Sequence, residues 1–385
     1  MGIFYDYSLS YHRDAQGRVL IWWQSELFCS LFLRCLLLFC NFATMFTTTI
    51  LDWFRHNGRD LPWRHTADPY AIWLSEIILQ QTQVKQGMDY WLRFTRRWPR
   101  VEDLAAATED EVLREWQGLG YYSRARNLHA AAKQIVAMGK FPDTLEGIRQ
   151  LKGVGDYTAA AIGSIAFGLP AAVVDGNVYR VLARHYGIDT PINTTLGKKV
   201  FTALAQSLLP PDQPSAFNQA MMDFGAIQCT PQTPRCAVCP LQETCDALHT
   251  GRISQLPVKR KTLKVQTRHL SYLYLRSDGR TAMRRRPAGD IWQGLWEPVL
   301  LVDDGASHLP LSESLSAALR TDAILLRRQV KHVLTHRILL ADFYFLENSV
   351  QPSLPADYHW IAEAELGNYA LPRLVELLLA SLPEA

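Results

Sequence analysis

The chain has 385 residues, of which 48% are hydrophobic and 20% are charged, a composition that excludes a disordered or fibrous protein. At roughly 100–200 residues per domain, this length predicts two or three folded domains. The net charge of +3 is no signature of nucleic-acid binding by itself, so any argument for such a partner depends on local motifs. Seven cysteines are too few, and odd in number, for a disulfide-stabilised scaffold.

The first part of the chain differs from the rest. Its apolar run, Leu27–Ala43, contains Arg34 and is shorter than the ~20 residues that a membrane span needs. A long polar segment precedes this run, which is atypical of a signal peptide. We expect residues 1–44 to be a dispensable extension or the product of an upstream start, with a membrane anchor as the alternative.

The hydrophobic periodicity divides the remainder into two domains joined by a linker. Residues 45–251 have the three- and four-residue apolar spacing of helices, with boundaries at Asp68 and Asp110. Residues 252–267 are rich in Lys and Arg and contain no acid, which indicates a basic linker. Residues 268–385 are predicted to form an α+β domain. Its predicted elements are strands over 270–276, 297–302 and 338–346 and a closing helix over 371–382.

A glycine-containing turn precedes a helix of small residues. Gly153 and Gly155 lie in residues 151–159, Leu-Lys-Gly-Val-Gly-Asp-Tyr-Thr-Ala, and allow a tight turn between two helices. Backbone N–H groups that point outward at the start of a helix can bind a DNA phosphate. The alternative is an ordinary turn between helices.

Two acidic residues are candidates for acid–base chemistry. Glu76 is flanked on a predicted helix by Ile72, Trp73, Leu79 and Gln80, and such burial raises the pKa of a carboxyl group toward that of a general acid. The alternative is a Glu whose carboxylate reaches solvent or pairs with a structural Arg. Asp175 ends an apolar run before a predicted helix, where it could be a helix cap or an ionised carboxylate beside a developing cation. A protonated and an ionised carboxyl group together can cleave a glycosidic bond.

Four cysteines lie within seventeen residues, separated by six, two and five residues. This clustering predicts a metal site in a reducing compartment, and four thiolates suit either zinc or an iron–sulfur cluster. The predicted ligands are Cys229, Cys236, Cys239 and Cys245.

Residues 50–380 resemble the MutY family of adenine DNA glycosylases, which belong to the helix–hairpin–helix glycosylase superfamily. The hairpin and the cysteines match that family. So do five further segments, at residues 61–64 (Leu-Pro-Trp-Arg), 75–84 (Ser-Glu-Ile-Ile-Leu-Gln-Gln-Thr-Gln-Val), 118–128 (Gly-Leu-Gly-Tyr-Tyr-Ser-Arg-Ala-Arg-Asn-Leu), 174–178 (Val-Asp-Gly-Asn-Val) and 217–226 (Phe-Asn-Gln-Ala-Met-Met-Asp-Phe-Gly-Ala). The resemblance implies a mainly α-helical catalytic domain with an iron–sulfur cluster loop at 229–245, one 4Fe-4S cluster, and removal of adenine mispaired with 8-oxoguanine or guanine.

The resemblance also implies roles for individual residues. Glu76 matches the general acid, and Asp175 matches the carboxylate that stabilises the sugar cation. Tyr157 and Asn177 match residues that orient these groups and the water. Gln81 and Tyr121 match side chains that enter the base stack after the base is flipped out. The adenine pocket is expected to comprise Arg59, Trp63, Arg64, Leu79, Gln219 and Met222.

Tyr157 decides between two subclasses. The related endonuclease III has a Lys at this point of the hairpin, and that amine forms a Schiff base with the sugar. A phenol cannot form an imine, so we expect hydrolysis without efficient strand cleavage.

The C-terminal domain resembles the family's Nudix-like module for recognising 8-oxoguanine. No Glu-rich metal box follows the segment 292–298, Trp-Gln-Gly-Leu-Trp-Glu-Pro, so pyrophosphate hydrolysis is not expected. The lesion-reading loop is predicted at Leu334, Thr335 and His336, where the family usually has Phe-Ser-His. The alternative is that Leu334 is only a core residue.

Other readings are an endonuclease III-like glycosylase/lyase, a non-catalytic DNA-damage-binding protein, and a Nudix hydrolase with a helical appendage. Arg124 and Arg126 are candidates for phosphate contacts, with a solvated helical face as the alternative. We expect a monomer that binds duplex DNA, does not bind a membrane, and resides in the bacterial cytoplasm with the nucleoid.

Overall fold

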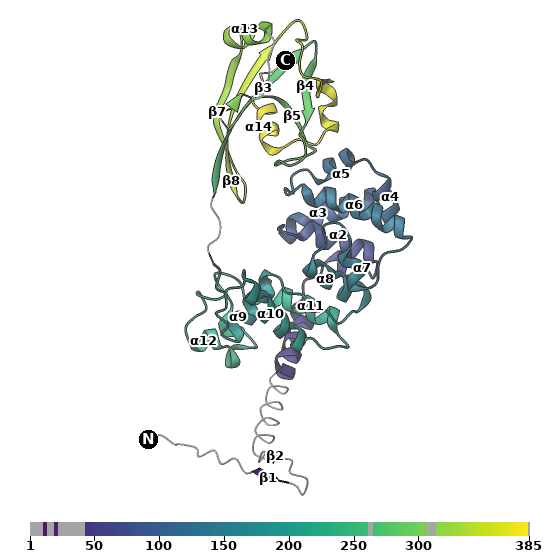
Figure 1. Ribbon diagram of the computed structural model, residues 1–385, viewed down its shortest axis with the longest axis vertical. Coiled ribbons are helices and arrows are strands. Elements are labelled where there is room, and N and C mark those ends of the chain that lie inside the picture. The colour runs from purple at the N-terminus through teal and green to yellow at the C-terminus, as the bar shows by residue number, and fades with distance from the viewer. Residues whose placement is uncertain are drawn as a thin grey trace. The chain divides into compact units, whose positions relative to one another are not determined.

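The computed structural model describes residues 11–13, 19–21, 43–260, 265–304, 306–307 and 313–383 (Figure 1). Residues 261–264 of the predicted linker, and most of the predicted extension 1–44, lie outside these ranges. The chain divides into two compact units. The first comprises Met1–Arg59 and Ala172–Val258, and the second comprises Asp60–Ala171 and Lys259–Ala385.

The first unit is built around helices, as the apolar periodicity predicts. A helix over residues 43–57 contributes Phe46 and Ile50 to a core that also contains Phe201 and Phe217. Its other elements are α9 (Gly176–His185), α10 (Thr195–Leu208), α11 (Pro214–Asp223), η2 (Phe224–Gln228), η3 (Cys236–Val238), η4 (Gln242–Thr244), α12 (Asp246–His249) and the antiparallel pair β1 (Tyr11–Arg13) and β2 (Val19–Ile21).

The second unit begins with helices. They are η1 (Pro62–Arg64), α2 (Pro69–Leu79), α3 (Val84–Arg97), α4 (Val101–Ala106), α5 (Glu109–Trp116), α6 (Ser123–Met138), α7 (Leu145–Arg149) and α8 (Asp156–Phe167). Asp68 caps α2 as expected, because its side chain accepts from the amide of Tyr70. The predicted boundary at Asp110 lies one residue after the first residue of α5, and Thr108 caps this helix in a reciprocal arrangement with Glu111.

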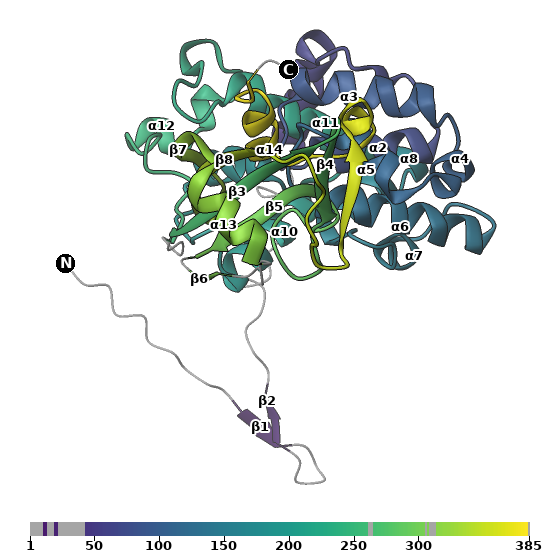
Figure 2. The same ribbon diagram turned by 90° about the horizontal axis from the view of Figure 1, so that it is seen from above.

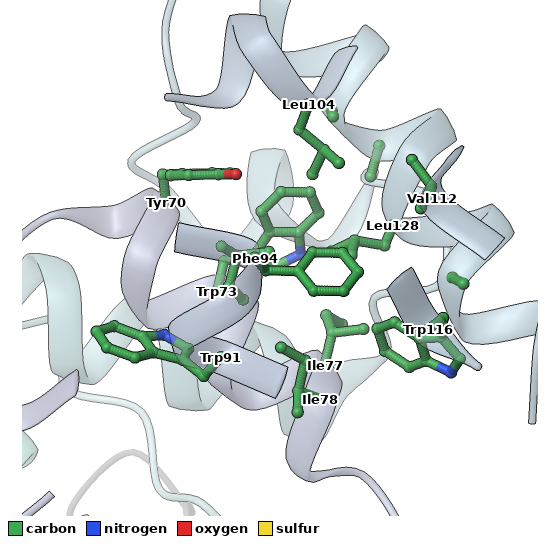
Figure 3. Packing of buried hydrophobic residues seen from close by; sticks show 14 of the residues in the cluster. Tyr70, Trp73, Ile77, Ile78, Trp91, Phe94, Leu104, Val112, Trp116 and Leu128 are labelled. Atoms are coloured by element: carbon green, nitrogen blue, oxygen red, sulfur yellow. The ribbon is translucent and has the colours of Figure 1, made fainter. Parts of the chain in front are cut away.

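Aromatic and aliphatic side chains together fill the core of these helices (Figure 3). Trp73 and Trp116 are fully buried, and Phe94 meets Trp116 edge to face with ring centroids 5.8 Å apart. Every residue from Tyr70 to Ile78 is buried, so α2 is the central helix of the group. A helix that is apolar on all sides is stable only when its neighbours surround it.

The rest of the second unit is a seven-stranded mixed sheet with the order β6-β5-β4-β3-β8-β7, and β9 pairs with β4. The pair β3–β8 is parallel and the other pairs are antiparallel. The elements are β3 (Gln266–Ser277), β4 (Arg280–Arg285), β5 (Trp296–Asp303), β6 (Ala306–Ser307), α13 (Glu313–Thr321), β7 (Ile324–Val333), β8 (Arg337–Glu347), β9 (Tyr358–Ala362), η5 (Glu363–Asn368) and α14 (Arg373–Leu379). The three predicted strands and the closing helix are therefore confirmed.

The two faces of the sheet bury alternate residues of β3. Tyr272 and Tyr274 pack with Leu374 of α14, whereas Leu273 and Leu275 pack with Leu315 of α13. Figure 2 shows β3, β5 and β8 side by side, in agreement with their pairing. The two helices therefore cover opposite faces, which gives the predicted α+β domain.

Candidate active site and cysteine cluster

Glu76 lies on α2 and has an exposed fraction of only 9%. The hydroxyl of Tyr157, in the first turn of α8, donates a hydrogen bond to Oε2 of Glu76 over 3.4 Å. A second polar contact joins the same two helices, since Nε2 of Gln80 donates to Oγ1 of Thr158 over 3.1 Å. The expected burial of Glu76 is confirmed, and the structure brings it together with Tyr157.

The hairpin before α8 contains two glycines in different conformations. Gly153 has a φ of +79°, and a Cβ built there would lie 2.7 Å from Cβ of Asn127. Gly155, which caps α8, has a φ of −98° and open space where a Cβ would be. The amide of Lys152 donates to Oε1 of Gln134 over 2.7 Å. Only Gly153 is required by the geometry of the turn.

Asp175 caps α9, as one of the two readings of the sequence predicts. Its Oδ1 accepts hydrogen bonds from the amides of Asn177 and Val178, each over 2.8 Å. Burial raises the pKa of Asp175, and the hydrogen bonds from Val178 and Asn177 and the charge of Arg180 oppose that increase. The hydrogen-bond donors around the carboxyl group therefore lessen, but do not reverse, the effect of burial.

Asn177 and Arg180 link this cap to the cysteine loop. Nδ2 of Asn177 donates to Oδ2 of Asp175 over 2.7 Å, and its Oδ1 accepts from Nη2 of Arg180 over 2.8 Å. Nε of Arg180 donates to the carbonyl of Cys229 over 2.7 Å. A Cβ at Gly225 would lie 2.6 Å from Cβ of Asn177, so this glycine lets η2 approach the network closely. Asp175, Asn177 and the first cysteine thus share one hydrogen-bonded group.

The four cysteines are free and half-buried. Burial raises the pKa of the Cys239 thiol to about 11, with smaller contributions from the three neighbouring thiols. Thiols that affect one another in this way would repel as thiolates, and a bound cationic centre would relieve that repulsion. Nη1 of Arg184 donates to Sγ of Cys229 over 3.4 Å. Within the described ranges, no group of three or more His, Cys, Asp or Glu side chains is arranged to hold a metal ion.

The residues predicted for the adenine pocket have structural partners of their own. Arg59 donates through Nε to Oδ1 of the fully buried Asp223 over 2.8 Å. Trp63 is buried and meets Trp91 edge to face, with Leu79 packed against the same core. These contacts hold the side chains in place whether or not they bind a base. Arg64 is half-buried, Gln219 donates to Oγ of Ser215 over 3.0 Å, and Met222 packs against the core of the first unit.

Gln81 and Tyr121, the two predicted wedge residues, share an unusual backbone conformation. Their φ angles are +58° and +48°, a left-handed region that costs a non-glycine residue roughly 1–2 kcal/mol. Both side chains are exposed, Gln81 after α2 and Tyr121 before α6. The strain indicates that surrounding contacts fix both loop tips.

The predicted lesion-reading loop joins β7 to β8 and borders a cavity of about 610 Å³. Leu334, Thr335 and His336 line this cavity together with Tyr121 and Trp292, and the hydroxyls of Tyr121 and Thr335 are hydrogen-bonded. Leu334 is half-buried and also packs against the core of the sheet. Leu334 therefore contributes to the core of the sheet and also borders the cavity.

Arg124 and Arg180 are the main residues whose positions sequence reasoning missed. Both are buried, with exposed fractions of 8%. The sequence suggested that Arg124 contacts a phosphate or lies on a solvated helical face, and its burial is at odds with both interpretations. The position of Arg180 one helical turn after Asn177 could have indicated the contact between these two side chains. For Arg124 the sequence offers no comparable signal.

Family profiles of known proteins match both the helical part of the chain and its C-terminal part. Residues 74–206 match the profile of the HhH-GPD superfamily of base excision DNA repair proteins, and residues 271–381 match the NUDIX domain. A solved structure of a thermostable thymine-DNA glycosylase superposes with a TM-score of 0.51 and 33% identity, over 54% of this chain and 97% of that chain. The helical part therefore has the helix–hairpin–helix fold of base excision repair proteins, joined to a Nudix-like domain.

Comparison with individual relatives identifies the family within this superfamily. The adenine DNA glycosylase of Buchnera aphidicola subsp. Baizongia pistaciae is 37% identical over 257 residues, which cover 66% of this chain and 72% of the relative. The chain belongs to the adenine DNA glycosylase family. The mouse and human adenine DNA glycosylases are each 46% identical over 56% of this chain. The chain spans less than half of these two relatives, 44% and 41% of their lengths.

In the part of the chain that the structure describes, every helix falls short of the length and hydrophobicity that a bilayer crossing requires.

Proposed function

We propose that this chain is a monofunctional adenine DNA glycosylase, which hydrolyses the N-glycosidic bond of adenine opposite 8-oxoguanine or guanine in duplex DNA. The observation that carries the proposal is the buried Glu76 carboxyl group with the Tyr157 phenol beside it. A buried acid can supply the proton that the leaving base needs, and a phenol in this place cannot attack the sugar as an amine would. Membership of the adenine DNA glycosylase family supports the choice of base.

In the proposed reaction, Glu76 gives its proton to N7 of the extruded adenine. The bond between C1′ and N9 breaks, and its electron pair remains on the base. Asp175 stabilises the positive charge that develops on the sugar, and Asn177 holds the Asp175 carboxylate through its amide. The Glu76 carboxylate then takes a proton from water as the oxygen bonds to C1′. The sugar keeps the hydroxyl group, and neither DNA strand is cut.

Duplex DNA is the proposed partner, because an enzyme reaches this bond only after flipping the nucleotide out of the stack. Gln81 and Tyr121 fill the gap, and the hairpin with Gly153 and Gly155 binds phosphate. Arg59, Trp63, Arg64, Leu79, Gln219 and Met222 receive the adenine. Leu334, Thr335 and His336 read the opposite base. We propose residues 45–251 and 268–385 as the catalytic and lesion-recognition domains of a monomer in the bacterial cytoplasm, with the nucleoid.

Cys229, Cys236, Cys239 and Cys245 would hold the proposed 4Fe-4S cluster, because four soft sulfur ligands on one loop suit such a group. When bound, the cluster cross-links the loop 229–245 and stabilises its fold. Arg180 and Arg184 anchor this loop through the carbonyls of Cys229 and Thr230, at 2.7 Å each. Analysis of iron, sulfide and zinc in the purified protein tests the assignment. A brown protein with iron and sulfide supports it, and a colourless protein with one zinc ion contradicts it.

Release of free base tests the proposed reaction. The protein is incubated with duplexes that carry adenine opposite 8-oxoguanine, guanine or cytosine, and free adenine is measured by chromatography. The proposal predicts release from the first two duplexes and an intact sugar–phosphate backbone in each. Equal release from the cytosine duplex would contradict recognition of the opposite base.

A further inference from the structure

Arg124 stands out in the helical part of the second unit as a buried cation surrounded by backbone carbonyls. It lies in the first turn of α6. Nη1 lies 3.1 Å and 3.0 Å from the carbonyl oxygens of Ile77 and Ile78, and it also donates to the carbonyl of Gln80. Nη2 lies 3.3 Å from the carbonyl oxygens of both Leu119 and Gly120. Both terminal nitrogens therefore have acceptors, whereas Nε is buried without a hydrogen-bond partner in the part of the chain that the structure describes. A buried cation depends on such acceptors for its stability.

These acceptors come from two segments that are distant in the sequence. The first group ends α2 and leads into Gln81, and the second leads into Tyr121. Oγ1 of Thr82, on the far side of Gln81, lies 3.4 Å from both terminal nitrogens of Arg124. Arg124 therefore contacts the residues that immediately flank the two exposed wedge candidates. A planar guanidinium group with a fork of donors can bridge two loops, whereas a lysine ammonium cannot reproduce that geometry.

The electrostatics favour this position. The carbonyls at the C-terminal end of α2 carry the negative end of the helix dipole, which attracts a cation. The guanidinium also lies over the rings of Trp116 and Tyr121, with centroid distances of 5.1 Å and 5.6 Å. Burial lowers the pKa of Arg124 to about 10, so the group remains charged at neutral pH. Its charge is used inside the protein, away from any phosphate.

We propose that Arg124 is a positioning residue that joins the loop tips at Gln81 and Tyr121 into one rigid wedge. This inference rests on the proposed function. In it, the single buried side chain of Arg124 holds the backbone of both loop tips in the left-handed conformation. Removal of the fork would leave each tip free to relax to a commoner conformation. The two side chains would then enter the base stack independently, and the extruded state would form less often.

The test compares Arg124→Lys with Lys133→Gln, a control that removes one positive charge from the exposed face of the same helix. Single-turnover adenine release is measured on the duplex with 8-oxoguanine. In parallel, 2-aminopurine beside the target adenine reports unstacking by its fluorescence. We expect Arg124→Lys to lower both signals about ten- to a hundredfold, as small misplacements of distant groups can do. Lys133→Gln should leave both unchanged.

A double-mutant cycle separates positioning from a general loss of structure. In a Gln81→Ala/Tyr121→Ala background, Arg124→Lys should change the rate by less than about twofold, the usual error of additivity. The same loss in both backgrounds, or no loss in the native background, would overturn the inference and leave the proposed function standing. If the native protein releases no adenine, the proposed function fails and the inference fails with it. Should Arg124→Lys not fold, Thr82→Val removes a hydroxyl partner of Arg124, and the same cycle with it decides the question.

Discussion

The hydroxyl of Tyr157 lies 3.4 Å from Oε2 of Glu76 and donates a hydrogen bond to it. The phenol comes from the first turn of α8, and the carboxyl group comes from the central helix α2. A donor in this position holds the carboxyl group in one orientation. Because a phenol has no amine to form an imine with the sugar, the pair points to hydrolysis rather than to lyase chemistry.

Borohydride trapping checks this interpretation of Tyr157. The native protein should give no strong covalent adduct with the duplex that carries adenine opposite 8-oxoguanine, because no Schiff base forms. Tyr157→Lys places an amine in the hairpin and serves as the positive control for trapping. A strong adduct with the native protein would contradict the assignment of Tyr157.

The two hairpin glycines should differ in their effect on stability. Gly153→Ala forces a side chain into a left-handed conformation and against Asn127, so it should lower the free energy of unfolding by about 1–3 kcal/mol. Gly155→Ala meets open space and should cost less than about 1 kcal/mol, the usual effect at a helix cap. Urea denaturation measures both changes. Equal losses of unfolding free energy in the two variants would show that the left-handed backbone at Gly153 adds no cost for a side chain.

The pKa of Asp175 predicts a pH dependence of stability. Burial raises this pKa above its ordinary value of 3.8, so the folded state binds a proton more tightly than the unfolded state. The stabilisation is fully present below pH 3.8 and is lost as the pH rises through the folded-state pKa. Asp175→Asn keeps an oxygen for the amides of Asn177 and Val178 and removes the titration.

Denaturation of both proteins over a pH series measures this linkage. The free energy of unfolding of the native protein, minus that of Asp175→Asn, should fall as the pH rises from 3.8 through the folded-state pKa. A difference that grows with pH over this range would mean that the hydrogen bonds outweigh burial.

His336, which borders the cavity beside Tyr121, should contribute to the discrimination between 8-oxoguanine and guanine. His336→Ala should reduce the ratio of adenine release opposite 8-oxoguanine to release opposite guanine by about tenfold, the value of one good hydrogen bond in a base contact. His359→Ala, an exposed histidine on β9, is the matched control and should leave the ratio unchanged. An unchanged ratio in His336→Ala would remove this loop from lesion recognition.

The sequence predicts the fold well where the periodicity is strong. The apolar spacing around Trp73 predicts a buried helix, and the alternation around Tyr272 and Tyr274 predicts a strand. Both are found. Both predicted helix boundaries lie within one residue of a helix start. Asp68 caps α2 itself, whereas Thr108, with its hydroxyl and its partner Glu111, caps α5 in place of Asp110.

The site is less predictable because much of it depends on contacts between distant segments. The position of Glu76 in an apolar segment indicates burial, but nothing local identifies Tyr157 as its donor. The sequence suggests that Arg124 faces solvent or DNA, and only the fold shows that two loops surround it with carbonyls. The convergence of Glu76 and Asp175 on one nucleotide stays a prediction, since the two residues belong to different compact units.

The most direct test of the central claim compares the native protein with Glu76→Gln in single-turnover release of adenine from the duplex with 8-oxoguanine. The account predicts that the rate falls about 10²–10⁴-fold, the usual contribution of a general acid, while the affinity for the same duplex is retained. A Glu76→Gln variant that releases adenine at the native rate would contradict the claim that this carboxyl group protonates the leaving base.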